Sequence, residues 1–497
     1  MTSAVLTDPP ATTETPATTD PTAALHPLAP MTLEQAGLRI DMVMQLVLKN
    51  LYFAGELSGL ELAHRLGLAF SVLEPALDQI KRLQECEITG MIGGESYGRR
   101  ITTPSPASLG IFDDRRVTTQ GTAGHAIPGV AVSDDSHSGI GGASYNYRIT
   151  TLGRERAQLF LDGNHYVGVA PVPLAQYQDY LERYRASVPR TVTPSKVRAA
   201  FSHIVLSDRV LDQIGPAIVA AHSMFMYGAP GNGKTLIAQG IQNLLEGEIA
   251  VPHAIEVEGS IIKLFDPVIH EVLADAPDAP GLDRGPRRDA RWARCRRPMV
   301  MVGGELTLNS LELAYSPTMK FYTAPIQAVA NGGVLVIDDF GRQQCSPASL
   351  LNRWIVPLES RVDFLTLTTG QKIELPFLPL VVFATNINPA ELVDEAFLRR
   401  IHYKVAAESP TVADFRRIFE ACCRARGVAY EEWLVDWLID DYYQPRGIPM
   451  RGCQPRDLIE HALGLAEYLG APRQLTPALL EAACAGYFVD DSTGGSA

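Results

Sequence analysis

A glycine-rich segment between an apolar stretch and a helix-forming stretch constrains this chain more than any other feature. Residues 228–235 read Gly-Ala-Pro-Gly-Asn-Gly-Lys-Thr and fit the pattern G-x-x-x-x-G-K-S/T. The apolar residues Met224–Tyr227 precede this segment, and Leu-Ile-Ala at 236–238 follows it. Glycines let backbone N–H groups converge on phosphate oxygens, and the positive end of the following helix favours the same anion. The segment therefore predicts a strand, a phosphate-binding loop and a helix, which together begin an α/β domain.

This loop predicts a site for ATP. We expect Lys234 to neutralise the β- and γ-phosphates, and the hydroxyl of Thr235 to bind Mg²⁺. The residues expected to surround the nucleotide are Gly228, Ala229, Pro230, Gly231, Asn232, Gly233, Lys234, Thr235 and Leu236.

A second apolar segment ends in two acids. Val334–Ile337 consists of four apolar residues, and Asp338 and Asp339 follow it. Ligands of open α/β sheets bind at the carboxyl ends of the strands, so a buried strand here would carry both carboxylates to the nucleotide. We expect Asp338 to hold Mg²⁺, usually through water, and Asp339 to orient or deprotonate the attacking water.

Three further segments complete a resemblance to a known superfamily. They read Phe-Ala-Thr-Asn at 383–386, Asp-Glu-Ala-Phe-Leu-Arg-Arg-Ile at 394–401 and Gln-Pro-Arg-Asp-Leu at 454–458. With the two motifs above, and in the same order, they resemble the AAA+ ATPases over residues 195–490. The resemblance implies that Asn386 and Arg456 contact the γ-phosphate. It also implies that Arg400, or the adjacent Arg399, is an arginine finger toward a neighbouring subunit, and the position just before an apolar residue favours Arg400.

Two details refine this resemblance. Residues 350–375 look like the MoxR and magnesium-chelatase branch, in which a helix, a β-hairpin and a Leu-Pro step precede the strand that ends in the polar sensor residue. Most AAA+ proteins have Glu where this chain has Asp339. Because Asp is one methylene shorter, we expect either slow turnover or a local compensation.

The pattern of strands predicts the boundaries of the ATP-binding region. From about residue 195, apolar segments alternate with helical ones, which predicts a doubly wound α/β domain over residues 195–405. The expected strands are Met224–Tyr227, residues 254–258, Met299–Val302, Val334–Ile337 and residues 380–384. After residue 406 only helices are expected, so residues 406–490 should form an all-helical lid.

The preceding part of the chain predicts a winged helix-turn-helix domain over residues 31–187. A helix capped by Thr32 and ending near Phe53 would be followed by two shorter helices, by strands at 86–89 and 145–150, and by another helix. The segment from Tyr147 to Arg156 also resembles the wing-to-helix segment of bacterial winged-helix regulators.

Two other segments have compositions that favour disorder. Residues 1–30 are mostly Thr, Pro and Ala, and we expect a disordered tail there. Residues 92–143 are rich in Gly and Ser and have little periodicity, so we expect a flexible loop inserted between the two strands of the wing.

Charge bears on the partner of the winged helix. The formal net charge of −13 weighs against non-specific binding of nucleic acid by the whole surface. The presumed recognition helix carries Lys81 and Arg82 but also Glu74, Asp78 and Glu85, whereas helices that read DNA present excess positive charge. We therefore expect a protein partner, with nucleic acid as the alternative.

Arginines also gather downstream of the phosphate-binding loop, around Trp292. They are Arg284, Arg287, Arg288, Arg291, Arg294, Arg296 and Arg297. Two interpretations stay open: a basic loop that faces an acidic partner or nucleic acid, and a solvated insertion.

Composition predicts the cellular compartment. No apolar run approaches the roughly 18 residues of a membrane span, and the N-terminus lacks the apolar core of a secretory signal. The seven cysteines are odd in number and form no C-x-x-C pair, as expected for reduced thiols. We expect a cytoplasmic protein without membrane insertion.

These features favour a ring-forming ATPase that remodels a protein partner recruited by the winged helix. The resemblance implies a homo-oligomer, with a hexamer as the expected ring. Two alternatives stay open: an ATP-dependent DNA-binding regulator, and an ATP-gated scaffold that hydrolyses slowly because of Asp339.

Overall fold

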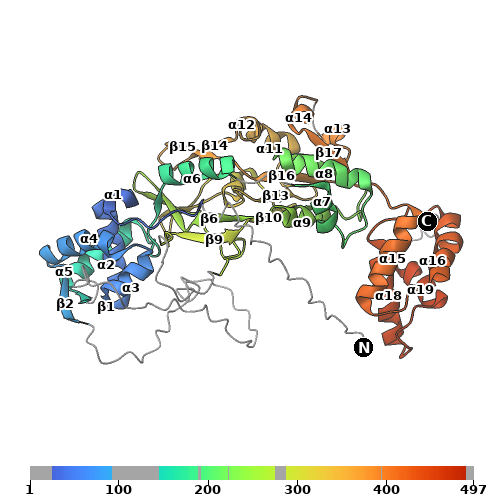
Figure 1. Ribbon diagram of the computed structural model, residues 1–497, viewed down its shortest axis with the longest axis horizontal. Helices are drawn as coiled ribbons and strands as arrows, with labels where there is room; N and C mark the ends of the chain where they lie inside the picture. Colours follow the sequence, from blue (N-terminus) through green and yellow to red (C-terminus); the bar gives the residue numbers. More distant parts are fainter. Residues whose placement is uncertain are drawn as a thin grey trace, which may run out of the picture. The chain divides into compact units, whose positions relative to one another are not determined.

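The computed structural model describes residues 25–91, 145–187, 192–221, 223–274, 287–392 and 395–488. The chain divides into two compact units, each described by itself below (Figure 1). The second unit comprises Pro30–Gly163, and the first comprises the chain on either side of it. The second unit is therefore an insertion in the first.

A parallel sheet forms the centre of the first unit. Its strands lie in the order β10 (Met299–Val302), β13 (Val334–Ile337), β16 (Leu380–Thr385), β5 (Met224–Tyr227) and β17 (Tyr403–Ala406). Strands β13 and β16 are buried along their whole length, which explains their unbroken apolar sequences. The predicted strands at β5, β10 and β13 are confirmed to the residue, and β16 is one residue longer than predicted.

One strand of this sheet was predicted wrongly. Residues 254–258 contribute β7 (Ala254–Val257), which pairs in a different sheet. The fifth parallel strand is instead β17, at the edge beside β5. The sequence did not indicate this strand, since only Val405 of its four residues is fully buried.

Helices cover both faces of the central sheet, as a doubly wound fold requires. Alternate residues of a strand face opposite sides, so Met224 and Met226 pack against one group of helices and Phe225 against another. The first group is α7 (Pro194–Ala200), α8 (Asp208–Ala220) and α9 (Lys234–Leu244). The second group is α10 (Ile326–Val329), α11 (Pro347–Arg353), α12 (Ile355–Ser360) and α14 (Glu395–Arg400). The short α13 (Pro389–Leu392) and the 3₁₀ turn η3 (Leu308–Leu311) lie in the connections.

A second sheet and two hairpins accompany the central sheet. The sheet order is β11 (Ala314–Ser316), β12 (Phe321–Thr323), β8 (Ser260–Lys263), β7 and β4 (Val172–Pro173). The hairpins are β6 (Glu248–Pro252) with β9 (Trp292–Arg296), and β14 (Val362–Thr366) with β15 (Lys372–Pro376). Helix α6 (Leu174–Ser187) buries three tyrosines in the same core as these strands. It therefore belongs to the first unit, although the predicted domain 31–187 groups it with the N-terminal helices.

The arginine-rich segment fits neither interpretation from the sequence. Within the described residues 287–297, strand β9 carries Arg294 and Arg296, and Arg291, Arg294 and Arg296 form ion pairs inside the unit. Arg291 is buried with Asp289 (2.8 Å), and Arg294 Nε bonds Glu248 Oε2 (2.6 Å). Arg296 pairs with Glu271 (3.4 Å). Arg284 lies outside the described residues.

The end of the first unit is helical, as predicted, and has its own core (Figure 1). Its elements are α15 (Val412–Arg426), α16 (Glu432–Trp437), η4 (Leu438–Tyr443), α17 (Gln444–Arg446), α18 (Gln454–Tyr468) and α19 (Pro477–Tyr487). Phe415, Phe419, Leu458 and Leu480 are among its buried side chains. We call this part the lid.

The second unit contains helices around a small antiparallel sheet. Its elements are α1 (Leu33–Ala36), α2 (Ile40–Ala54), β1 (Glu56–Ser58), α3 (Gly59–Leu66), α4 (Phe70–Arg82), β2 (Cys86–Met91), β3 (Tyr145–Ile149) and α5 (Thr151–Gly163). The two predicted strands pair with each other, and β1 adds a third strand beside β3. The helix predicted from Thr32 to Phe53 is two helices, because Gly37 adopts a left-handed conformation (φ 68°) and ends α1.

The predicted N-terminal tail is only partly described. Residues 1–24 and the predicted loop at 92–143 lie outside the described residues. Residues 25–29, which we predicted to be disordered, pair with the first unit: Ala29 N donates to Arg287 O and Asp289 N donates to Pro27 O, both at 2.8 Å. Leu25 packs against the core that contains Trp292. All seven cysteines are free thiols, and none of the described helices has the length and apolarity to cross a bilayer.

Candidate functional site: a nucleotide site at the ends of three strands

The phosphate-binding loop follows β5 and has the conformation that its glycines predict. Gly228, Gly231 and Gly233 have φ of 147°, 80° and 75°, and Gly233 is the N-cap of α9. A Cβ atom on Gly228 would lie 2.3 Å from the carbonyl oxygen of Ala407, and one on Gly231 would lie 2.5 Å from Cys453 Sγ. The backbone conformation and the lack of space both require glycine at these two positions.

Lys234 lies under this loop. It is buried, and its Nζ donates to the carbonyl oxygens of Gly228 (3.0 Å) and Ala229 (3.1 Å) and to Asn386 Oδ1 (2.5 Å). Burial lowers the pKa of the Lys234 ammonium, and the carboxylates of Asp338 and Asp339 oppose that shift. A cation buried among oxygen acceptors is suited to bind a phosphate group.

Thr235 and Asp338 form a pair of hard oxygen ligands. Thr235 Oγ1 donates to Asp338 Oδ2 at 2.9 Å, while Asp338 Oδ1 accepts from the backbone N–H of Asp339 at 3.0 Å. Mg²⁺ prefers one or two carboxylates, phosphate oxygens and water. The residues at this position therefore fit the metal that the sequence predicts.

The second acid also belongs to the site. Asp339 has a left-handed backbone (φ 48°), and its Oδ1 accepts from Asn386 Nδ2 at 3.0 Å. Asn386 thus connects Lys234 to Asp339, which brings residues that follow β5, β13 and β16 together. Gln343, which we did not identify from the sequence, bonds the backbone oxygens of Asp338 and Asp339. No local motif marks this glutamine.

The lid meets the phosphate-binding loop through its backbone. Cys453 N donates to Gly231 O at 2.8 Å, and Gly452 N donates to Asn232 Oδ1 at 3.4 Å. Asn232 Nδ2 also donates to Ala407 O at 3.1 Å. Asn232 was expected at the nucleotide, and its side chain also joins the loop to the lid.

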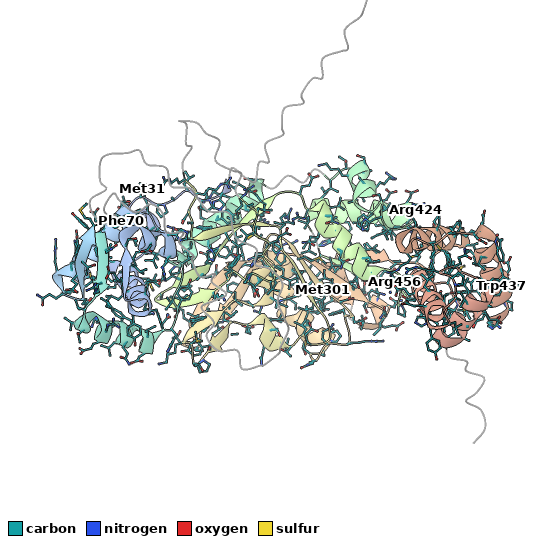
Figure 2. All side chains as sticks on the ribbon, turned by 90° about the horizontal axis from the view of Figure 1, so that it is seen from below. Met31, Phe70, Met301, Arg424, Trp437 and Arg456 are labelled. Atoms are coloured by element: carbon teal, nitrogen blue, oxygen red, sulfur yellow. The ribbon has the colours of Figure 1, made fainter. Side chains whose placement is uncertain are left out.

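Two lid arginines differ in their surroundings. Arg456, labelled in Figure 2, bonds Asp457 Oδ1 through Nε (2.9 Å) and Nη2 (2.8 Å), and more than half of its side chain is exposed. Arg451 instead donates to the neutral Ser409 Oγ at 2.6 Å. Its Cβ lies 3.6 Å from where a Cβ on Gly231 would be, so it lies beside the loop. The sequence did not indicate Arg451.

The two finger candidates differ as well. Arg400 Nε donates to Glu359 Oε1 at 2.5 Å, and its guanidinium lies over the ring of Phe397 at 5.6 Å from the centroid. Arg399 is exposed and forms no hydrogen bond or ion pair with any residue that the structure describes. Asp394, at the start of this segment, lies outside the described residues.

Comparisons with known protein families match two parts of the chain. Residues 202–263, which include the phosphate-binding loop, match the family model for magnesium chelatase, subunit ChlI. Residues 411–486, in the lid, match a domain of unknown function, DUF8689. With the parallel sheet and its loop, the first match supports the AAA+ superfamily. A search of curated proteins returned no match.

Two solved structures are similar at low identity. One is the RuvB Holliday junction branch migration motor of Thermotoga maritima, with 12% identity, coverage of 58% of this chain and 71% of that chain, and a TM-score of 0.34. The other is NtrX from Brucella abortus in complex with ADP, with 15% identity, coverage of 63% of each chain and a TM-score of 0.36.

Proposed function

We propose that this protein is an AAA+ ATPase of the MoxR and magnesium-chelatase-like branch, which binds ATP with Mg²⁺ and hydrolyses it. One observation carries the proposal: a continuous set of hydrogen bonds joins Lys234 to Asn386 and Asn386 to Asp339, beside the pair formed by Thr235 and Asp338. Each of these residues was expected at the nucleotide from the sequence.

Each side chain has a distinct role in this proposal. Lys234 and the backbone N–H groups of the loop bind the phosphates, and Thr235 and Asp338 hold Mg²⁺, which neutralises charge on the phosphates. Asp339 accepts a proton from, or orients, the water that attacks the γ-phosphate. Asn386 donates to Asp339 and so fixes its carboxylate toward the phosphate end of the site.

The arginines complete the proposed site. The resemblance assigns Arg456 to the γ-phosphate, but Arg456 pairs with Asp457. Arg451 lies beside the loop, and among the described residues its guanidinium bonds only the neutral Ser409, so we favour Arg451 as the lid cation. For the finger, the sequence favours Arg400, but Arg399 is exposed and forms no ion pair with any residue that the structure describes, so we favour Arg399. A finger of this kind acts between subunits, so the proposal includes a homo-oligomer, with a hexamer expected from the resemblance.

The second unit is the proposed recruiting part, a winged helix that binds a protein. Helix α4 would be the recognition helix, and its Lys81 Nζ pairs with Asp78 Oδ1 at 2.7 Å. Arg148, on β3, pairs with Glu56 in the same way (2.8 Å). Because neighbouring carboxylates neutralise Lys81 and Arg148, α4 and β3 offer less positive charge to DNA phosphates. This observation favours a protein partner over a DNA-binding regulator.

The proposal is tested by nucleotide binding and turnover. Lys234→Ala should abolish both, because it removes the buried cation that faces the phosphates. Lys196→Ala is the matched control, since Lys196 lies on α7 and pairs only at the surface with Glu246 (2.7 Å). Wild-type turnover by purified Lys234→Ala would show that the site is assigned wrongly. Tight ATP binding with almost no turnover in the unmodified protein would favour the ATP-gated scaffold.

A further inference from the structure

The chain carries Asp339 where a longer acid was expected, and the backbone at this position is unusual. In an extended strand, successive side chains point to opposite faces. Val336 packs in the same core as α9 and Ile337 packs in the opposite core, so Asp338 faces α9 and its Thr235. A strand continued for one more residue would direct Asp339 to the opposite face, away from Thr235.

A turn prevents this. Asp339 adopts φ 48°, which is uncommon for a residue with a Cβ, and Gly341 follows with φ 109°. Arg342 N donates to Asp339 O at 3.0 Å and closes the turn. The carboxylate of Asp339 then reaches Asn386 Nδ2 at 3.0 Å. The carboxylates of Asp338 and Asp339 therefore lie at the same site, because the backbone turns away from the strand direction at Asp339.

The side chain of Gln343 bonds the backbone of this turn. Gln343 Nε2 donates to the carbonyl oxygens of Asp338 (2.9 Å) and Asp339 (3.2 Å), while its Oε1 accepts from Gly341 N (2.8 Å). These three bonds tie together the residues on both sides of the left-handed position. A left-handed conformation in a residue with a Cβ costs free energy and persists where its surroundings fix it.

The turn is also fixed to the central sheet. Phe340 N donates to Ala384 O and Thr385 Oγ1 donates to Phe340 O, both at 2.7 Å, and the Phe340 ring is buried. These hydrogen bonds fix the position of the turn relative to β16. They do not fix the carbonyl oxygen of Asp339, whose hydrogen-bond partners among the described residues are Gln343 and the backbone of Arg342.

We propose that Gln343 is a positioning residue that holds the shorter acid, Asp339, in reach of the attacking water. It is the local compensation for the missing methylene. Gln343 acts through Asp339 and has no bond to the phosphate-binding loop among its described contacts, so it should affect the chemical step and leave ATP binding intact. The inference rests on the proposed ATPase function.

The experiment compares two neighbouring glutamines in the full chain. Gln343→Met keeps the length of the side chain and removes all three hydrogen bonds, and Gln344→Met makes the same change at the exposed next residue. We measure the dissociation constant of a fluorescent ATP analogue, kcat for ATP hydrolysis, and thermal unfolding without nucleotide. Gln343→Met should lower kcat about tenfold to a hundredfold, because displacement of a catalytic group by about 1 Å has effects of that order. ATP affinity should stay within about twofold of Gln344→Met, since the lost interaction serves the transition state.

A second variant keeps the test decisive if Gln343→Met folds poorly. Gln343→Glu retains an oxygen for Gly341 N and loses the donor to both carbonyl oxygens, so it should lose turnover to a similar degree. Wild-type kcat in either variant overturns the role of Gln343, as does a loss of ATP affinity that matches the loss of kcat. A wild-type protein that does not hydrolyse ATP refutes the proposed function instead, so the two failures are distinguishable.

Discussion

The two adjacent arginines of α14 offer the sharpest test of assembly. Arg400 is tied within its own subunit to Glu359 on α12 and lies over the ring of Phe397. Arg399 projects from the same helix and has no such bond to the described residues. Substitution to Ala at the two positions should therefore affect different properties: folding stability at Arg400 and turnover in the assembled protein at Arg399.

Each of the two effects has an expected size. The ion pair of Arg400 is partly exposed, and such pairs contribute about 0.2–1 kcal/mol. The contact with the Phe397 ring adds about 0.5–1 kcal/mol at an exposed site. Arg400→Ala should then reduce the free energy of unfolding by about 0.7–2 kcal/mol and lower the melting temperature by a few degrees. Arg399→Ala should leave the melting temperature unchanged and reduce turnover by about 10³–10⁵, as for fingers in related NTPases.

The assay combines thermal unfolding with ATP hydrolysis in mixtures. Subunits with Lys234→Ala still present Arg399 to a neighbour, whereas subunits with Arg399→Ala retain an intact loop. Mixing the two inactive variants should restore part of the activity if they co-assemble. Loss of turnover in Arg400→Ala without loss of stability would return the finger to Arg400. Wild-type turnover in both single variants would refute a finger in this helix.

Two further predictions concern the lid. Arg451→Ala should weaken ATP binding about tenfold or more, because a charge-assisted hydrogen bond contributes about 1.5–3 kcal/mol, whereas Arg456→Ala should change ATP binding little. Titration with a fluorescent ATP analogue measures both affinities. The opposite order of effects would return the role of lid cation to Arg456. Gly231→Ala should prevent ATP binding, since its Cβ would lie 2.5 Å from Cys453 Sγ, while Gly464→Ala, which has open space, should bind normally. Normal binding by Gly231→Ala would contradict the close approach of the lid.

Contiguous patterns in the sequence predicted the residues at the centre of the candidate site. The loop, the acid pair after β13 and Asn386 after β16 were identified because each follows an unbroken apolar strand, and such strands end at one edge of a parallel sheet. The order of these segments was enough to predict that their side chains meet. The bonds among Lys234, Asn386 and Asp339 agree with that prediction.

Features that depend on distant partners were missed. Strand β17 has too little apolar sequence to be recognised without β5 beside it. Arg294 looked like a solvated or ligand-binding cation, but its partner Glu248 lies 46 residues away in the sequence. Gln343 was missed for a different reason: its bonds to the carbonyl oxygens of Asp338 and Asp339 depend on the turn after β13, where Asp339 is left-handed.

The segment at residues 25–29 has a mechanical consequence. Because it pairs with residues 287–289 of the first unit, the chain leaves that unit at Ala29 and returns to it at Asn164. The inserted unit is therefore attached to the first unit by two covalent connections. A domain attached through a single linker can rotate freely about it. A domain attached through two linkers resists such rotation and divides any applied force between the two linkers. If the proposed protein partner binds this unit, any pull on it passes through both connections, and cleavage of either connection alone leaves the unit attached.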